Sequence, residues 1–113
     1  MVLSSQPFAT LPRFSVVQPK GASARNAPML VVLSADSVDG LALVVVAPAV
    51  RLKDHGPITR GLHVPVQVNG EARVVVTEEL VSIPKSALGK PVALLDAHRG
   101  ALVAALDFLF QGY

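Results

Sequence analysis

The chain has 113 residues, a formal net charge of +2 and no cysteine. This length suits one domain with a modest core, and the absence of cysteine excludes a disulfide framework and a zinc site built on thiolates. The basic residues are scattered, which does not favour a nucleic-acid-binding surface. Apolar residues make up 51% and charged residues 16% of the chain, which predicts apolar surface buried between subunits.

The N-terminal residues 1–11 show no hydrophobic periodicity and include Pro7. They lack a basic start followed by an apolar core, so we predict no signal peptide and expect a cytoplasmic location. We interpret them as an additional, loosely held arm. A misassigned start codon is the alternative.

Short β-prone segments separated by turn residues follow. We predict strands at residues 14–18, 29–33, 41–50 and 81–84, a single turn at 85–89, and loops at 20–26 and 34–40. The segment 41–50 is apolar on both faces, which predicts a central strand with Pro48 at a bulge or bend.

Residues 64–77 predict a hairpin around Asn69-Gly70. A two-residue turn would place Val66 opposite Arg73 and mix apolar with charged side chains on one face. A three-residue loop with a bulge at Gly70 keeps that face apolar, so we predict this register. Its pairs are Val68 with Ala72, Val66 with Val74, and Val64 with Val76.

No motif in the chain predicts catalysis. The histidines His55, His63 and His98 have no ligand spacing, so we predict surface or half-buried side chains and no metal or cofactor. There is no phosphate-binding loop and no nucleophile motif. Residues 51–62 form a long irregular segment that we interpret as a solvated connector. The residues indicate a binding module more than an enzyme.

The last eighteen residues, 96–113, predict a helix with Asp96 as its N-cap and Gly112 at its end. One apolar stripe consists of Leu102, Ala105, Leu106 and Leu109, and Val103 and Phe110 lie off it. We therefore expect two buried faces, one against the domain and one against a partner protomer. Asp107 lies either at the edge of that interface or toward a partner protein. The fold class is mainly β with a C-terminal α-helix, as a small barrel or curled sheet.

These elements resemble CcdB, the toxin of the CcdA–CcdB toxin–antitoxin system. The C-terminal block 95–113 is similar to the family's closing helix, and residues 29–36, 44–48, 64–77 and 81–84 resemble its strands. The similarity is collinear over residues 14–113 and leaves 1–13 as an N-terminal extension.

The resemblance implies an SH3-like barrel of the CcdB/MazF type and a homodimer. It also implies binding to the gyrase A subunit, with trapping of the cleaved DNA complex, and neutralisation by a CcdA-like antitoxin. The toxin–antitoxin complex would repress its own operon, so operator DNA is contacted only through that complex. The dimer contacts would come from Leu102, Val103, Leu106 and Phe110.

The resemblance assigns target binding to the C-terminal tail and one helix face. The residues are Gln111, Gly112, Tyr113, Asp107, Ala104 and Gly100. The family has a tryptophan where this chain has Gln111, and its stacking on an arginine is worth ~0.5–2 kcal/mol. Glutamine has no π face, so we predict a weak poison of DNA gyrase or none.

Two alternatives stay open. The first is a homologue with a lost or altered target that still binds antitoxin. The second is a MazF-like endoribonuclease, for which Arg51, Lys53, His55 and Arg60 are the candidate cluster. Fold similarity alone does not decide between them.

Overall fold

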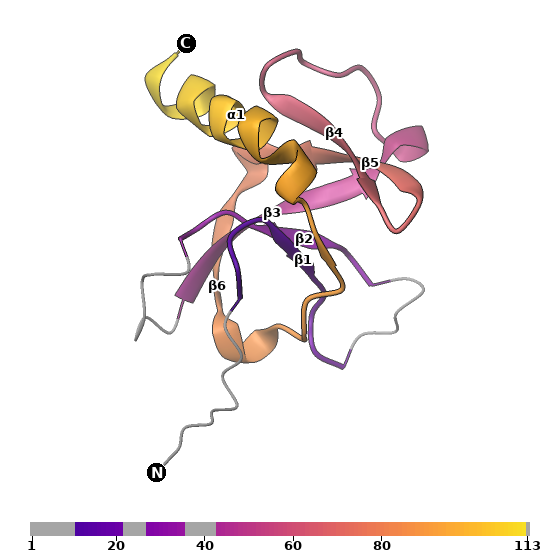
Figure 1. Ribbon diagram of the computed structural model, residues 1–113, viewed down its shortest axis with the longest axis vertical. Helices are drawn as coiled ribbons and strands as arrows, with labels where there is room; N and C mark the ends of the chain where they lie inside the picture. The colour runs from indigo at the N-terminus through magenta and orange to yellow at the C-terminus, as the bar shows by residue number, and fades with distance from the viewer. Residues whose placement is uncertain (1–10, 22–26, 36–42, 113) are drawn as a thin grey trace.

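The computed structural model describes residues 11–21, 27–35 and 43–112, which form one curled antiparallel sheet and a C-terminal helix (Figure 1). The strands are β1 (Ser15–Val17), β2 (Leu30–Val32), β3 (Leu43–Arg51), β4 (His63–Val68), β5 (Glu71–Val76), β6 (Val81–Pro84) and β7 (Ala93–Leu94), followed by α1 (Arg99–Gln111). Short 3-10 turns are η1 (Leu52–Asp54), η2 (Thr77–Glu79), η3 (Lys85–Ala87) and η4 (Asp96–His98). The prediction of a mainly β fold with one C-terminal helix is confirmed.

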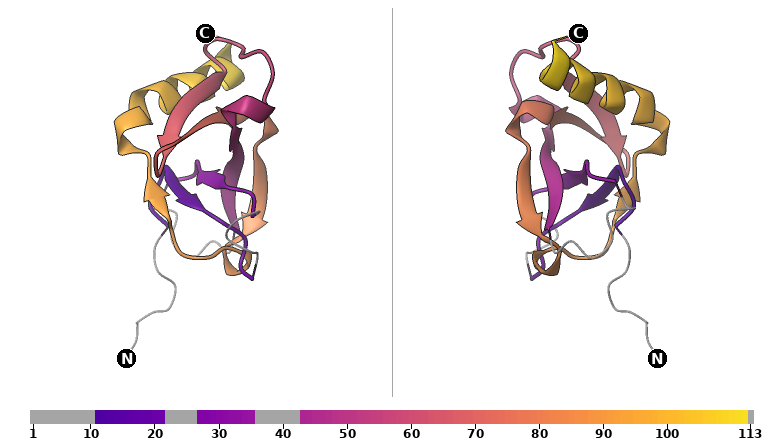
Figure 2. Two further views of the ribbon diagram at one scale, coloured as in Figure 1. Left: turned by 90° about the vertical axis from the view of Figure 1, so that its right-hand side faces the viewer. Right: turned by 90° about the vertical axis from the view of Figure 1, so that its left-hand side faces the viewer.

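The sheet runs in the order β4-β5-β3-β2-β1-β7, and β6 pairs with β3 outside this path. Seen from the side, the strands curl around a central space in the manner of an open barrel, and α1 lies across one end (Figure 2). The predicted strand at residues 81–84 is confirmed as β6, and the single turn after it as η3. The short strand β7, which pairs with β1, was not predicted.

Strand β3 is central, as predicted, because it pairs with three other strands. Its residues Leu43–Val46 pair with β6 and its residues Ala49–Arg51 with β5. The Ala49 N–H donates to the Met29 carbonyl, on the edge of β3 that faces β2. Successive backbone nitrogens point to alternate edges of a strand, so the nitrogen of Pro48 points to the other edge. There it lies between the segment of β3 that pairs with β6 and the segment that pairs with β5. Proline lacks an N–H, and this is the one place on that edge where no ladder bond is required.

The hairpin of β4 and β5 has a different register from the predicted one, with a two-residue turn. Val66 pairs with Arg73, Val68 with Glu71 and Val64 with Val75. Asn69 has φ 50° and Gly70 has φ 85°, the two positive values that a tight two-residue turn requires. The prediction of a bulge was wrong because a charged side chain does occupy the inner face: Arg73 is only 7% exposed.

The C-terminal helix begins later than predicted. Asp96 is not its N-cap, because residues 96–98 form the 3-10 turn η4 and α1 starts at Arg99 without a side-chain cap. Asp96 instead accepts a 3.1 Å bond from Arg99. Gly112 ends the helix as predicted, with φ 83° and its N–H on the Phe108 carbonyl. Glycine adopts this left-handed conformation without steric cost.

The described residues form two apolar clusters. The larger includes Phe14, Val64, Leu102 and Ala105, and joins α1 to the sheet. The smaller contains Leu11 with Val17, Val32, Val44, Val46 and Leu88. Leu11 is 8% exposed, and Arg13 donates to the Leu33 carbonyl, so the packed structure already includes the last residues of the segment 1–13.

Candidate functional site

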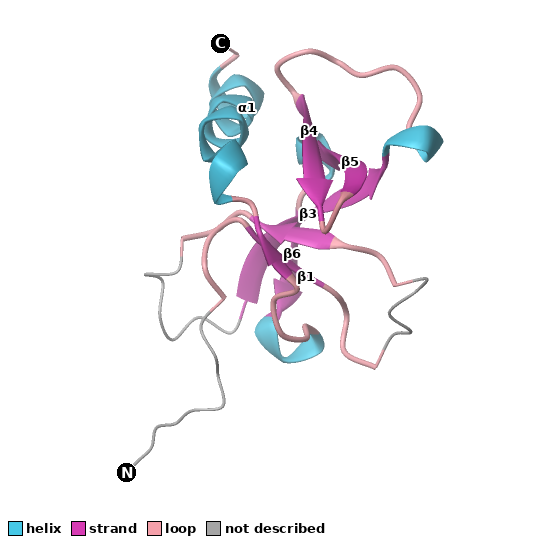
Figure 3. Ribbon diagram, turned by 45° about the vertical axis from the view of Figure 1, so that its right-hand side comes forward, coloured by secondary structure: helices cyan, strands magenta, loops and turns pink. Residues whose placement is uncertain are grey.

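The target-binding residues expected from the resemblance share one exposed face of α1. Gly100, Ala104, Asp107 and Gln111 are all exposed, and their spacing of three or four residues stacks them along the helix. We call these four residues the target face. Gly112 follows it and is exposed as well, and Tyr113 lies outside the described residues. Figure 3 shows α1 beside β4, at the outside of the curled sheet.

The residues expected at a dimer interface have different environments. Leu102 is fully buried within its own chain, so it holds α1 on the domain and offers no surface to a second copy. Val103 and Leu106 are half-buried against the main core. Phe110 is 70% exposed and Phe108 40% exposed. Of the four expected residues, Phe110 therefore presents the largest apolar surface.

A groove of about 550 Å³ runs beside α1. We call it the helix groove; its lining residues are Ile58, Arg60, Gly61, His63, Val64, Pro65, Ala101 and Ala104. Gly61 lies close to the helix, because a Cβ built there would be 3.9 Å from Cδ2 of Phe108. Ala104 belongs to both the helix groove and the target face.

His63 fixes the loop that forms one wall of this groove. Its Nδ1 accepts a 2.9 Å bond from the Thr59 N–H, and its Nε2 lies 2.8 Å from a carboxylate oxygen of Glu78. Only the neutral tautomer with the proton on Nε2 satisfies both contacts. The His55 ring meets the His63 ring edge-on, with 4.8 Å between centroids. His63 is therefore a structural anchor with both nitrogens engaged.

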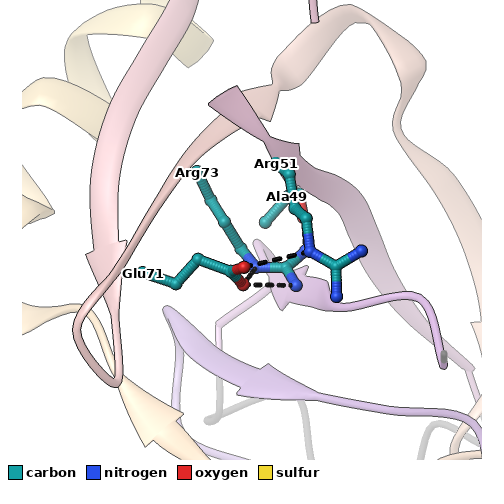
Figure 4. Close-up of polar contacts among 4 residues, drawn as sticks. All are labelled: Ala49, Arg51, Glu71 and Arg73. Carbon is teal, nitrogen blue, oxygen red and sulfur yellow. Dashed lines mark hydrogen bonds and ion pairs between the residues drawn. The ribbon is translucent and has the colours of Figure 1, made fainter. Parts of the chain in front are cut away.

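A second polar cluster links β3 and β5, as Figure 4 shows. Arg73 donates a 2.6 Å bond from Nη1 to the Ala49 carbonyl, and its Nη2 lies 2.8 Å from Oε1 of Glu71. The other oxygen of Glu71 accepts a 3.0 Å bond from Nε of Arg51. The buried arginine thus orients a carboxylate, which in turn orients a second, half-exposed arginine.

The carboxylates of Glu71 and Glu78 both have lowered pKa values, but for different reasons. The hydrogen bond from Arg51 is the largest influence on the pKa of Glu71, and with the bond and charge of Arg73 it outweighs the effect of desolvation. For Glu78, desolvation is the largest single influence and raises the pKa. The hydrogen bond from His63 and the backbone hydrogen bond of Glu78 lower the pKa and outweigh desolvation.

The predicted ribonuclease cluster is only partly brought together. Arg51 and His55 line a cavity of about 390 Å³ with Asp54, Arg73 and Glu79, over apolar residues that include Met29 and Pro48. Arg60 lines the helix groove instead, and Lys53 lines neither. The cavity therefore holds two of the four residues and places carboxylates beside them.

The clusters around Glu71 and Glu78 were not predicted from the sequence. The pairing of Val66 with Arg73 would have indicated the cluster around Glu71. The predicted register avoided this pairing because it places a charged side chain among valines. In residues 11–21, 27–35 and 43–112, no three histidine, cysteine or acidic residues gather as metal ligands. No helix in the same residues is long and apolar enough to cross a membrane.

Comparison with known proteins gives a family and a fold. A family model described as CcdB protein matches residues 13–112. No curated protein matches significantly. The Mycobacterium tuberculosis toxin MazF-mt6 is 26% identical with a TM-score of 0.66, over 85% of this chain and 95% of that chain. An endoribonuclease from a mycobacterial species is 15% identical with a TM-score of 0.73, over 93% of this chain and 95% of that one.

A further solved structure holds a mycobacterial endoribonuclease in complex with its cognate antitoxin. It is 16% identical, with a TM-score of 0.70, over 88% of this chain and 94% of that chain. At 15% and 16% identity, these two endoribonuclease structures share the fold alone with this chain. The family model spans nearly the whole chain, and the curled sheet with its closing helix agrees with it. The chain belongs to the CcdB family, whose members are toxins of toxin–antitoxin systems.

Proposed function

We propose that this protein is the toxin of a type II toxin–antitoxin pair and that it acts by binding a topoisomerase, with the gyrase A subunit as the first candidate. The proposal rests on the target face. Gly100, Ala104, Asp107 and Gln111 form a continuous exposed surface, while Leu102 on the other side of α1 anchors the helix in the core.

The composition of the target face supports binding with little poisoning. Gln111 offers hydrogen bonds but no aromatic ring, so it cannot stack on an arginine. The small residues Gly100 and Ala104 allow close approach of a partner without adding much contact area. A protein that binds its target here without trapping cleaved DNA fits this surface best, and we propose that it is not an enzyme.

A homodimer is part of this proposal. Phe110 is 70% exposed near the chain end, and a second copy packed against it would remove that apolar surface from water. Such a dimer would also place two target faces on one particle. Sedimentation or light scattering would measure its mass.

Expression in a gyrase-sensitive bacterium tests the target. We expect a weak growth defect from the natural chain, a stronger one from Gln111→Trp, and no gain from the matched apolar control Gln111→Leu. A gyrase mutation should relieve the arrest caused by Gln111→Trp. If the natural chain arrests growth strongly and the gyrase mutation relieves it, the expected weakness is wrong; if purified gyrase binds neither the natural chain nor Gln111→Trp, the gyrase target is wrong.

A ribonuclease is the second candidate, supported by Arg51 and His55 lining one cavity. Cleavage would require one of them as the base or cation beside the scissile phosphate. Incubating RNA with the natural chain, Arg51→Ala and His55→Ala decides this point. Cleavage that both substitutions abolish would replace the binding proposal with an enzymatic one.

A further inference from the structure

The cavity that Arg51 and His55 line has the size of a small-molecule site, and we call it the arginine cavity. Its volume of about 390 Å³ lies within the range of ~300–1,000 Å³ that is typical of ligand pockets. None of its lining residues belongs to α1. Met29, Pro48 and Val76 contribute apolar surface to it. The arginine cavity therefore has room for a small molecule with an apolar part.

Arg51 brings hydrogen-bond donors to this cavity that no described residue uses. Its Nε donates a 3.0 Å bond to Glu71, and Figure 4 shows its two Nη atoms on the side away from that carboxylate. The Nη atoms carry most of the donors of a guanidinium, in a fork that matches the two oxygens of a carboxylate. Arg51 can therefore bind the carboxylate of a ligand while it keeps its bond to Glu71.

The guanidinium of Arg51 is held in place before a ligand arrives. The buried Arg73 donates to the Ala49 carbonyl at 2.6 Å and holds one oxygen of Glu71 at 2.8 Å, and the other oxygen of Glu71 holds Arg51. A side chain oriented in this way loses little conformational entropy on binding. Two arginines share one carboxylate here, so one positive charge remains for a ligand.

Two carboxylates line the same cavity without an ionic partner. Asp54 of η1 and Glu79 of η2 are both exposed, so they lie at its rim. In the part of the chain that the structure describes, neither forms an ion pair, and Arg51 pairs with Glu71 instead. An ammonium group donates hydrogen bonds to such carboxylates. The arginine cavity therefore presents both signs of charge next to apolar surface.

We propose that the arginine cavity binds a free α-amino acid with an apolar side chain. The ligand carboxylate accepts hydrogen bonds from the Nη atoms of Arg51. Its ammonium group donates to Asp54 and Glu79, and its side chain covers the apolar part of the lining. This inference goes beyond the proposed function and does not depend on it, because it concerns a different surface from the target face.

Ligands that carry a single sign of charge fit the cavity less well. Inorganic phosphate or a nucleic-acid phosphate can bind Arg51, but it also meets the like charges of Asp54 and Glu79. A simple amine can bind the two carboxylates, but it leaves the Nη donors of Arg51 without an acceptor. A zwitterion satisfies both sets of groups at once.

Three related ligands test this charge pattern on the full-length natural chain. Free leucine has both charged groups, 4-methylpentanoate lacks the ammonium group and 3-methylbutylamine lacks the carboxylate. We expect a titration followed by amide NMR to show saturable shifts in β3 and η2 with leucine. Each analogue should bind at least about tenfold more weakly, because one set of charged groups in the cavity then has no partner.

Matched variants test the residues. Arg51→Met keeps the apolar stem and should weaken leucine binding about tenfold or more. Lys53→Met removes a positive charge two residues away, outside the cavity, and should leave binding unchanged. Glu79→Gln should weaken binding about threefold, since its carboxylate is exposed. The neighbouring Glu78→Gln lies outside the cavity and should have no effect.

Several results would overturn the inference. Leucine that causes no saturable shifts shows that the cavity is not an amino-acid site. Equal binding of leucine and 4-methylpentanoate, or displacement of leucine by inorganic phosphate, shows a site for anions only. The ligand series uses the natural chain, so it decides the point even where a variant fails to fold. Absence of a growth defect overturns the toxin assignment and leaves this binding result intact.

Discussion

Two glutamates flank strand β5, and they stabilise the fold in different ways. Glu71 begins the strand and joins two arginines, one of them buried, so that β3 and β5 are tied side by side. Glu78 follows the strand in η2 and reaches one histidine, which fixes the loop beside α1. The first cluster determines strand pairing and the second shapes one wall of the helix groove. Substitutions of Glu71 or of its partners Arg51 and Arg73 should therefore lower the stability of the whole fold. Substitutions of Glu78 or His63 should mainly loosen the loop beside α1.

The largest effect is expected from Arg73→Met, which keeps the apolar stem and removes the guanidinium. The Ala49 carbonyl then loses its buried donor, and the free energy of unfolding should fall by about 2–3 kcal/mol. Urea denaturation measures this. Arg51→Met is the control, because its pair with Glu71 is half-exposed and should contribute less than about 1 kcal/mol. Equal losses for the two arginines would contradict the role of Arg73 in strand pairing.

The next largest loss of stability is expected from Thr77→Val, which lies in η2 directly after β5 and next to Glu78. The shape of the side chain is kept, but the Leu62 carbonyl loses its 2.6 Å bond from a fully buried hydroxyl. We expect a loss of about 1–2 kcal/mol by urea denaturation. Thr77→Ser retains the hydroxyl and should recover part of that loss. No difference between the two variants would show that the hydrogen bond contributes nothing.

A smaller effect, of about 1 kcal/mol, is expected from His63→Leu, which removes both contacts of the ring. The substitution should destabilise the loop more than the whole fold, because the Thr59 N–H loses its acceptor. Hydrogen exchange at the Thr59 amide should therefore accelerate. His63→Asn restores an acceptor near the position of Nδ1 and should slow that exchange again. Fast exchange in both variants would mean that the ring holds the loop by packing instead of by hydrogen bonding.

The smallest effects concern pH. Both glutamates have folded-state pKa values below the ordinary 4.5, so their stabilisation is present above that pH and is lost as the pH falls through the lowered values. The stability difference between the natural chain and Glu71→Gln should therefore shrink below pH 4.5, and likewise for Glu78→Gln. Thermal unfolding across this range provides the measurement, and a constant difference would contradict the lowered pKa values.

Local patterns predicted the strands β2, β3 and β6, the 3-10 turn after Pro84 and the helix end at Gly112. Predictions from local patterns were wrong where contacts with other residues determine the local structure. Arg73 belongs on the inner face because the Ala49 carbonyl and Glu71 satisfy it, and residue 49 is 24 positions away in the chain. Asp96 carries the signature of an N-cap, but residues 96–98 turn as a 3-10 segment and its carboxylate pairs with Arg99.

The candidate site was predictable to a similar extent. The resemblance named the four residues of the target face, and the structure places them on one exposed face of α1; their role in binding a target stays a prediction. The helix groove was not predicted, because its lining combines three loop residues, which carry no helical or strand periodicity, with residues of β4 and α1 that are distant in the sequence. Leu102 illustrates a further limit: an apolar stripe in a sequence does not say whether its own domain or a partner buries it.

The division of β3 at Pro48 has a thermodynamic consequence. One continuous strand supplies the pairing edge for β6 in one half and for β5 in the other, while β2 runs along its opposite side. Neither half of the curled sheet retains a complete set of partners if the other melts. The whole sheet should therefore unfold in a single cooperative transition, and the slowest-exchanging amides should be found on β3.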